Sequence, residues 1–142
     1  MDKVELNKQL IVAIYKHDHD ELKECVEKGA DVNTFEIDGK EYNPLYCCII
    51  TQDTKAFEYL TRNGADVTEK IGHRKQSLLF CACHSQDLKI SIVQCILENG
   101  GIQDINYAPE GGRSPMEVAK VENPLLAKTF ERVLKSTENK GR

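Results

Sequence analysis

Tryptophan is absent from this chain of 142 residues, and aromatic residues make up only 6% of it. No run of about 18 apolar residues is present, so the sequence offers no candidate for a membrane-spanning helix. The first residues, Met1 to Glu5, lack the continuous apolar core of a signal peptide. We therefore expect a cytoplasmic protein with no membrane partner.

The sequence also lacks a strong excess of charge. Nineteen lysine and arginine residues stand against 23 aspartate and glutamate residues, which gives a formal net charge of -4. A surface that binds the phosphates of nucleic acid is basic, so nucleic acid is not the partner that this composition favours. The length suits one domain, and we treat residues 1–142 as a single unit.

Motifs of common catalytic sites are missing as well. We find no nucleophile with a recognisable base, no paired carboxylates and no zinc-protease helix. Gly111-Gly112 is not followed by Gly-Lys-Ser/Thr, so it does not form a phosphate-binding loop. We expect no enzyme activity, no cofactor and no bound metal.

What the chain does contain is an internal repeat. The segment 28–33 reads KGADVN, 63–68 reads NGADVT and 99–106 reads the looser NGGIQDIN, at spacings of about 35 residues. A similar segment begins each repeat and precedes one of these glycine-containing segments: QLIVA at 9–13, NPLYCC at 43–48 and QSLLFCA at 76–82. A fourth segment of this kind, SPMEVA at 114–119, begins a fourth repeat.

Each unit carries the signals of two helices. Proline suits the first turn of a helix, so Pro44 and Pro115 mark helix starts. Glycine at 29, 64 and 100 follows apolar periodic stretches and marks helix ends. Asp18, with Glu21 in a capping box, and Asp53 are expected to cap the second helices.

The second helices have one-sided apolar spacing, as at Phe57 and Leu60 or at Ile92, Val93, Ile96 and Leu97. One unit could not bury such a stripe alone, whereas stacked units cover one another. The residues after Leu134 have nothing apolar to bury, and we expect 135–142 to fray.

These residues resemble the ankyrin repeat, whose units begin T-P-L-H-x-A and continue with two antiparallel helices and a hairpin. The resemblance implies an all-α repeat solenoid of stacked antiparallel helix pairs joined by hairpin loops, with repeats at about 6–34, 35–68, 69–106 and 107–134. The third unit departs from the pattern. Ser77 stands for the proline, Leu79 stands for the histidine, and about three extra residues fall between Gln86 and Ile92, with two more near Ile102.

The resemblance also implies a function. Ankyrin-like arrays bind other proteins on a concave side formed by hairpin tips and first helices, and we expect a free chain of this kind to be monomeric. Carried over residue by residue, the candidate contact residues are Phe35, Ile37, Tyr42, Tyr46, Ile50, Ile71, His73, Lys75, Cys83, His84, Tyr107 and Arg113. Phe35 and Ile71 could instead fold back on the neighbouring hairpin.

Two other functions stay open. The chain could be a dedicated inhibitor, such as an immunity or antitoxin protein that blocks an enzyme. It could also be a thiol- or zinc-based sensor or enzyme, with Cys81, Cys83 and His84 joined by Cys47 or Cys48.

The zinc alternative is the weaker one, because helical residues two apart diverge by about 200°. Six reduced cysteines behave as small hydrophobes, and we place Cys48 and Cys81 at the alanine-like position of the first helix. The run from His17 to Asp20 is interpreted as a polar turn rather than a metal site.

Overall fold

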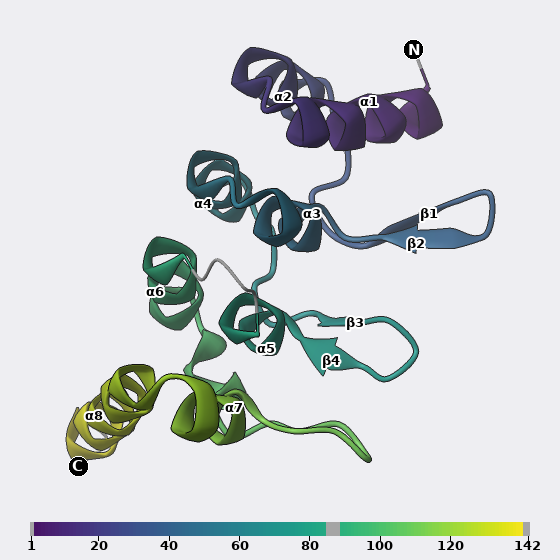
Figure 1. Ribbon diagram of the computed structural model, residues 1–142. Helices are drawn as coiled ribbons and strands as arrows, with labels where there is room; N and C mark the ends of the chain where they lie inside the picture. The colour runs from purple at the N-terminus through teal and green to yellow at the C-terminus, as the bar shows by residue number, and fades with distance from the viewer. Residues whose placement is uncertain (1, 85–88, 141–142) are drawn as a thin grey trace.

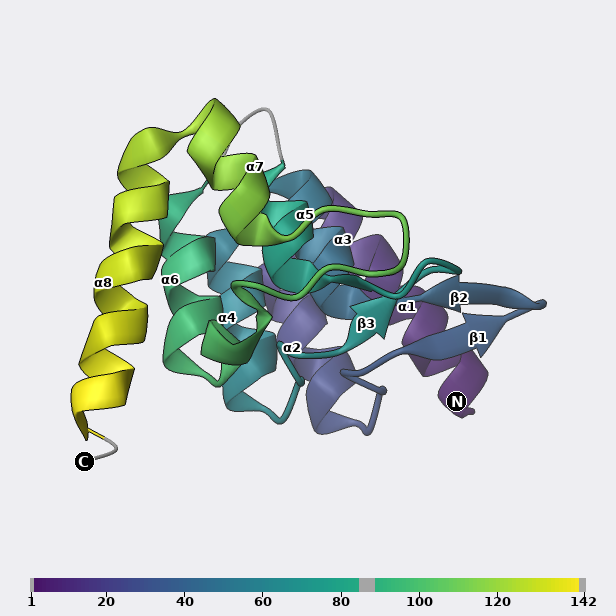
Figure 2. The ribbon, with the colours of Figure 1, turned by 90° about the horizontal axis from the view of Figure 1, so that it is seen from below.

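The computed structural model describes residues 2–84 and 89–140. Its described part forms a row of four helix pairs, with short hairpins projecting from one side (Figures 1 and 2). The helices are α1 (Lys3–Lys16), α2 (His19–Glu27), α3 (Pro44–Thr51), α4 (Thr54–Arg62), α5 (Leu78–Cys83), α6 (Ile90–Glu98), α7 (Pro115–Glu122) and α8 (Pro124–Lys140). A short 3-10 helix, η1 (Gly101–Asp104), follows α6.

The first helices α1, α3, α5 and α7 form one column of the row, and the second helices α2, α4, α6 and α8 form the other (Figure 1). The hairpins extend from the side of the first helices. The expectation of an all-α repeat solenoid built from antiparallel helix pairs is confirmed.

Three first helices begin in the same way. Asn43 caps α3 by accepting a hydrogen bond from the backbone N–H of Tyr46. Ser77 does the same for α5 and Ser114 for α7, where Glu117 completes a capping box. Side-chain oxygens at these positions satisfy backbone donors that the helix itself leaves free.

This common cap corrects the expected register of the third repeat. Ser77 matches the caps Asn43 and Ser114, not the prolines that follow them. Every later position of α5 therefore shifts by one. Ala82 takes the small position next to the neighbouring helix, and the prediction that Cys81 occupies it is wrong.

Of the second helices, α2 and α4 are capped by aspartates, as expected, whereas Lys89 at the start of α6 makes no side-chain cap. Asp18 accepts from the backbone N–H of Glu21, and Asp53 accepts from that of Ala56. The reciprocal bond that would make Asp18 and Glu21 a full capping box is not among the contacts of the described residues.

Two antiparallel hairpins separate the first three repeats. Strand β1 (Phe35–Ile37) pairs with β2 (Lys40–Tyr42), with Phe35 opposite Tyr42. Strand β3 (Lys70–Ile71) pairs with β4 (Gln76–Ser77). Positive φ angles at Asp38 and Gly39 form the tight turn between β1 and β2.

The core runs through the whole row. Its fully buried side chains come from all four repeats, which is the expected outcome when each helix pair covers the next. The largest of them are Leu10, Ile14, Leu22, Leu45, Phe57, Leu60, Leu78, Leu79, Ile96, Ile105 and Phe130.

The last helix extends to the end of the described residues. Helix α8 continues to Lys140, and the fraying expected from residue 135 stays a prediction. Backbone hydrogen bonds extend a helix one residue at a time once it is nucleated, and the packed first half of α8 supplies the nucleus. Residues 141–142 lie outside the described residues, as do positions 85–88, which include part of the extra segment expected between Gln86 and Ile92.

Candidate functional site: the first-helix stripe

The first helices expose one large residue at the same place in each repeat. Tyr15 and Ile50 lie two positions before the left-handed residues that end α1 and α3, and each is 50% exposed. In the corrected register His84 and Val121 take this place in the third and fourth repeats, and both are exposed. Adjacent helices pack about 8–10 Å apart, so the four residues form a ladder across the row.

Two further aromatic residues widen this ladder one helical turn earlier. Tyr46 on α3 is exposed, and Phe80 on α5 is half-buried. The Phe80 ring stacks on the His84 imidazole at 5.3 Å between centroids. We call the set Tyr15, Tyr46, Ile50, Phe80, His84 and Val121 the first-helix stripe.

The stripe is apolar with polar edges. Burial raises the pKa of the Tyr15 and Tyr46 hydroxyls, so both keep their protons at neutral pH and can donate hydrogen bonds. His84 Nδ1 lies 3.9 Å from Glu122 Oε2 at the side of the stripe. Isolated exposed apolar residues are ordinary, whereas an aligned set of this kind is typical of interaction surfaces.

The apolar side chains of the hairpins are more deeply buried than most of those in the first-helix stripe. The Phe35 side chain is buried and its ring stacks on Tyr42 at 6.1 Å between centroids. Ile37 and Ile71 are half-buried and pack against the core. Much of the apolar surface of the first two hairpins therefore stabilises the row itself.

Contacts between successive hairpins explain this burial. The Gly72 N–H donates to Glu41 Oε1 at 3.4 Å, and the Tyr107 hydroxyl donates to the Lys75 carbonyl at 2.6 Å. Lys70 Nζ lies 4.6 Å from the centroid of the Tyr107 ring. The hairpins are thus linked to one another at their bases and tips.

A buried ion pair lies below the second hairpin. Lys70 Nζ donates to Asp104 Oδ1 at 2.8 Å and to the Thr68 carbonyl at 2.8 Å. The Asp104 side chain is only 3% exposed, and its Oδ2 accepts no hydrogen bond within the described part of the chain. Lys70 is therefore the principal partner of this carboxylate.

The structure divides the sequence-based candidates into three groups. Cys83 and Phe35 are buried, so we remove them from the candidate surface. Ile37, Tyr42, Ile71 and Tyr107 are half-buried. The exposed candidates are Tyr46, Ile50, His73, Lys75, His84 and Arg113.

Phe80 was missed by the sequence reasoning. The register that aligned Ser77 with proline put Leu79 at the position now occupied by Phe80. Treating Ser77 as a helix cap, in line with Asn43 and Ser114, would have found it.

The cysteine thiols are not arranged for thiolate chemistry. Burial raises the pKa of Cys81 to about 11 and, together with Cys81, raises that of Cys83 to about 12. Burial also raises the pKa of Cys48. A reactive or metal-binding thiol needs a lowered pKa, and these shifts have the opposite sign.

His17, in the link between α1 and α2, and His19, the first residue of α2, make a specific contact with the second repeat. His17 Nδ1 lies 3.0 Å from Asp53 Oδ2, and His19 Nε2 lies 2.8 Å from the same oxygen. Burial by itself would raise the pKa of Asp53, but hydrogen bonds from Ala56 and both imidazoles hold it below its usual value. The carboxylate thereby joins α4 to the link between α1 and α2.

Two further features are absent from the described residues. No helix among them is long and apolar enough to cross a bilayer. No cluster of three or more histidine, cysteine, aspartate or glutamate side chains among residues 2–84 and 89–140 has the geometry of a metal site.

Comparison with known families agrees with this architecture. Residues 10–61 match the family model for ankyrin repeats (many copies). Over these residues the chain is similar to ankyrin repeats. A sequence search against curated proteins found no match. Ankyrin repeats are generally protein–protein interaction modules and generally not catalysts.

Proposed function

We propose that this chain binds a protein partner on the first-helix stripe, with the exposed hairpin residues His73, Lys75 and Arg113 at its rim. The observation that carries the proposal is the recurrence of a large exposed residue at one place in all four repeats. A stable fold does not need that recurrence, because the opposite face of each helix already supplies the core.

The chemistry of the stripe favours a partner with an apolar centre. Tyrosine, arginine and histidine next to aliphatic residues supply large contact areas, hydrogen bonds and few mobile side chains, as binding hot spots do. The rim adds the basic side chains Lys75 and Arg113, which favour acidic groups at the edge of the partner's contact patch.

A combined variant tests the proposal. Tyr15→Ser, Tyr46→Ser and Val121→Ser together remove three exposed side chains that make no contribution to the fully buried core. Affinity capture from native lysate with mass spectrometry identifies the partner of the unmodified chain. Loss of a central aromatic contact costs about 2 kcal/mol, or about thirtyfold, so the triple variant should lose capture of that partner.

A matched control separates the stripe from general surface effects. Val12 on α1 is 49% exposed, close to the value for Tyr15, but it lies beside α2 in a separate depression with Gln9 and Lys16. Val12→Ser should leave capture unchanged. Full capture by the triple variant, or equal loss with Val12→Ser, would show that the stripe is not the binding surface.

A dedicated inhibitor, such as an immunity or antitoxin protein, is a narrower form of the same function. An enzyme captured on the stripe would lose activity when bound one to one, and the triple variant would restore that activity. An enzyme that stays fully active in the complex would exclude this form for that partner.

A further inference from the structure

Furrows run along the back of the row between successive second helices, and the last furrow differs from the other two. The furrow between α2 and α4 carries Lys23, Lys55 and Arg62, with Lys23 Nζ 5.8 Å from the Tyr59 ring centroid. The furrow between α4 and α6 carries Arg62, Glu58 and Glu98. Both are lined largely by charged and polar side chains.

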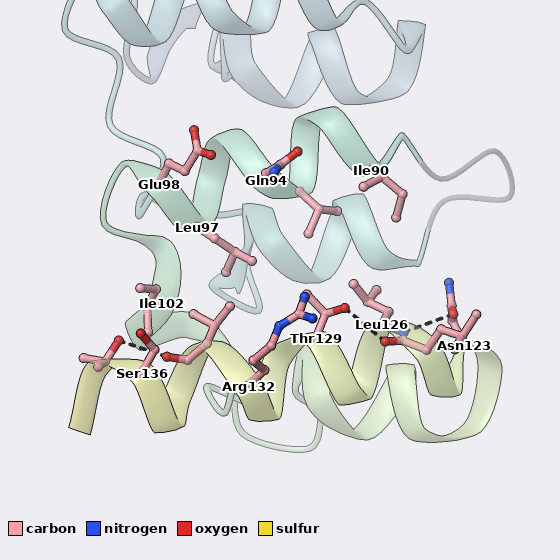
Figure 3. Close-up of a pocket in the computed structure, with 14 residues that line it drawn as sticks. Ile90, Gln94, Leu97, Glu98, Ile102, Asn123, Leu126, Thr129, Arg132 and Ser136 are labelled. Carbon is pink, nitrogen blue, oxygen red and sulfur yellow. Dashed lines mark hydrogen bonds between the residues drawn. The ribbon is translucent and has the colours of Figure 1, made fainter. Parts of the chain in front are cut away.

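The furrow between α6 and α8 is largely apolar (Figure 3). We call it the α6–α8 groove, and its walls include Ile90, Val93 and Leu97 from α6 and Leu125, Leu126 and Val133 from α8. Its volume is about 710 Å³, against about 550 Å³ for the furrow between α2 and α4 and about 280 Å³ for the furrow between α4 and α6. Pockets for small molecules span about 300–1,000 Å³.

Exposed apolar residues gather at one end of this groove. Ile90 is 54% exposed and Leu125 is 76% exposed, so neither is needed to fill the core. Both lie at the beginnings of their helices. The opposite end carries the polar side chains Glu98, Ser136 and Thr137, with Ile102 beside them.

One cation faces the middle of the groove. The Arg132 guanidinium points from α8 toward α6 in Figure 3. None of the ion pairs among the described residues involves it. The other charged lining residue, Glu98, stands at the polar end with its carboxylate directed away from α8 (Figure 3). An apolar wall about 10 Å long therefore extends from Arg132 to Leu125, at about 1.5 Å per helical residue.

We propose that the α6–α8 groove binds a medium-chain fatty carboxylate, with the alkyl chain between α6 and α8 and the carboxylate on Arg132. The apolar walls suit the alkyl chain of the ligand, because burying methylene groups is favourable without any directional contact. The guanidinium explains the head group, because arginine binds carboxylates through two parallel hydrogen bonds. The site lies on the second helices and does not depend on the first-helix stripe.

Decanoate, kept below the concentration at which it forms micelles, is the probe for this site. The full chain labelled on Ile, Leu and Val methyl groups is titrated and followed by NMR. We expect saturable shifts confined to the groove, chiefly at Ile90, Val93, Leu97 and Leu125. Decanol, which lacks the charge, should bind more weakly at the same place.

Exposed residues supply variants that should leave the fold intact. Arg132→Gln should weaken decanoate binding about tenfold, the lower end of the effect of a charge-assisted hydrogen bond, and leave decanol binding unchanged. Arg132→Lys should recover part of the loss. Lys128→Gln removes the same charge from the exposed side of α8, outside the groove lining, and should have no effect.

Several results would overturn the proposal. Absence of saturable binding at millimolar decanoate would do so, as would shifts on the first-helix stripe or equal losses from Arg132→Gln and Lys128→Gln. A dimer in light scattering that Leu125→Asn converts to monomer would assign the groove to a second copy. Binding of an amphipathic helical peptide in the groove, without binding of decanoate, would assign it to a protein partner.

Discussion

Asp53→Ala removes a single carboxylate from the junction of the first and second repeats. The side chain is 5% exposed and accepts hydrogen bonds from the Ala56 N–H at 3.1 Å and from the imidazoles of His17 and His19 at 3.0 and 2.8 Å. Loss of the helix cap costs about 1 kcal/mol. Each imidazole contact adds about 0.5–1 kcal/mol, a value reduced because both histidines are partly exposed.

The free energy of unfolding should therefore fall by about 2–3 kcal/mol in Asp53→Ala, measured by urea denaturation and far-ultraviolet circular dichroism at pH 7. The double variant His17→Ala, His19→Ala should lose about 1–2 kcal/mol. In that background Asp53→Ala should remove only the cap, about 1 kcal/mol. If Asp53→Ala costs the same in both backgrounds, the imidazoles do not stabilise the junction through this carboxylate.

The pH dependence gives a second check on the same residue. The pKa of Asp53 is lower in the folded chain than the usual value of 3.8, so its contribution is present above that pH and is lost as the pH falls through the folded value. The difference in unfolding free energy between the unmodified chain and Asp53→Ala should shrink below about pH 4. A constant difference down to pH 2 would contradict an ionised carboxylate at the junction.

Two further predictions concern other buried groups. Lys70→Met should lower the free energy of unfolding by about 3 kcal/mol in urea denaturation, because it leaves the Asp104 carboxylate buried without its cation. Adding Asp104→Asn to this variant should restore part of the lost stability, and an unchanged stability of Lys70→Met would contradict the ion pair. The raised pKa values of Cys81 and Cys83 stabilise the fold below pH 9.0, and this stabilisation is lost as the pH rises toward 11–12. The free energy of unfolding, measured by urea denaturation at a series of pH values, should therefore fall over this range, and it should fall less in Cys83→Ala. An equal fall in the unmodified chain and in Cys83→Ala would refute the assignment.

The architecture follows from a few residues that sequence analysis can interpret locally. Proline at 44 and 115 fixes a helix start, and glycine at 29, 64 and 100 takes the left-handed conformation that ends a helix. These signals depend on backbone chemistry within one turn. Their recurrence at a constant spacing is sufficient to predict a stack of helix pairs.

The candidate surface was harder to predict, because contacts between repeats decide it. Phe35 and Tyr107 are aromatic, as residues in contact with a partner often are. However, the Tyr42 ring of the same hairpin covers Phe35, and the Tyr107 hydroxyl donates to a carbonyl 32 residues earlier in the chain. The sequence contains no local sign of these partners. The one-residue shift at Ser77 had a different cause, since serine can replace either the first or the second residue of the T-P-L-H pattern.

The most direct test of the first-helix stripe is hydrogen exchange and side-chain footprinting of the chain with its captured protein partner. We expect slower labelling of Tyr15 and Tyr46 and of the helices α3, α5 and α7 in the complex than in the free chain. Labelling of α2, α4 and α6 should be the same in both. Protection confined to those second helices, with Tyr15 and Tyr46 labelled equally in the free and bound states, would contradict the account.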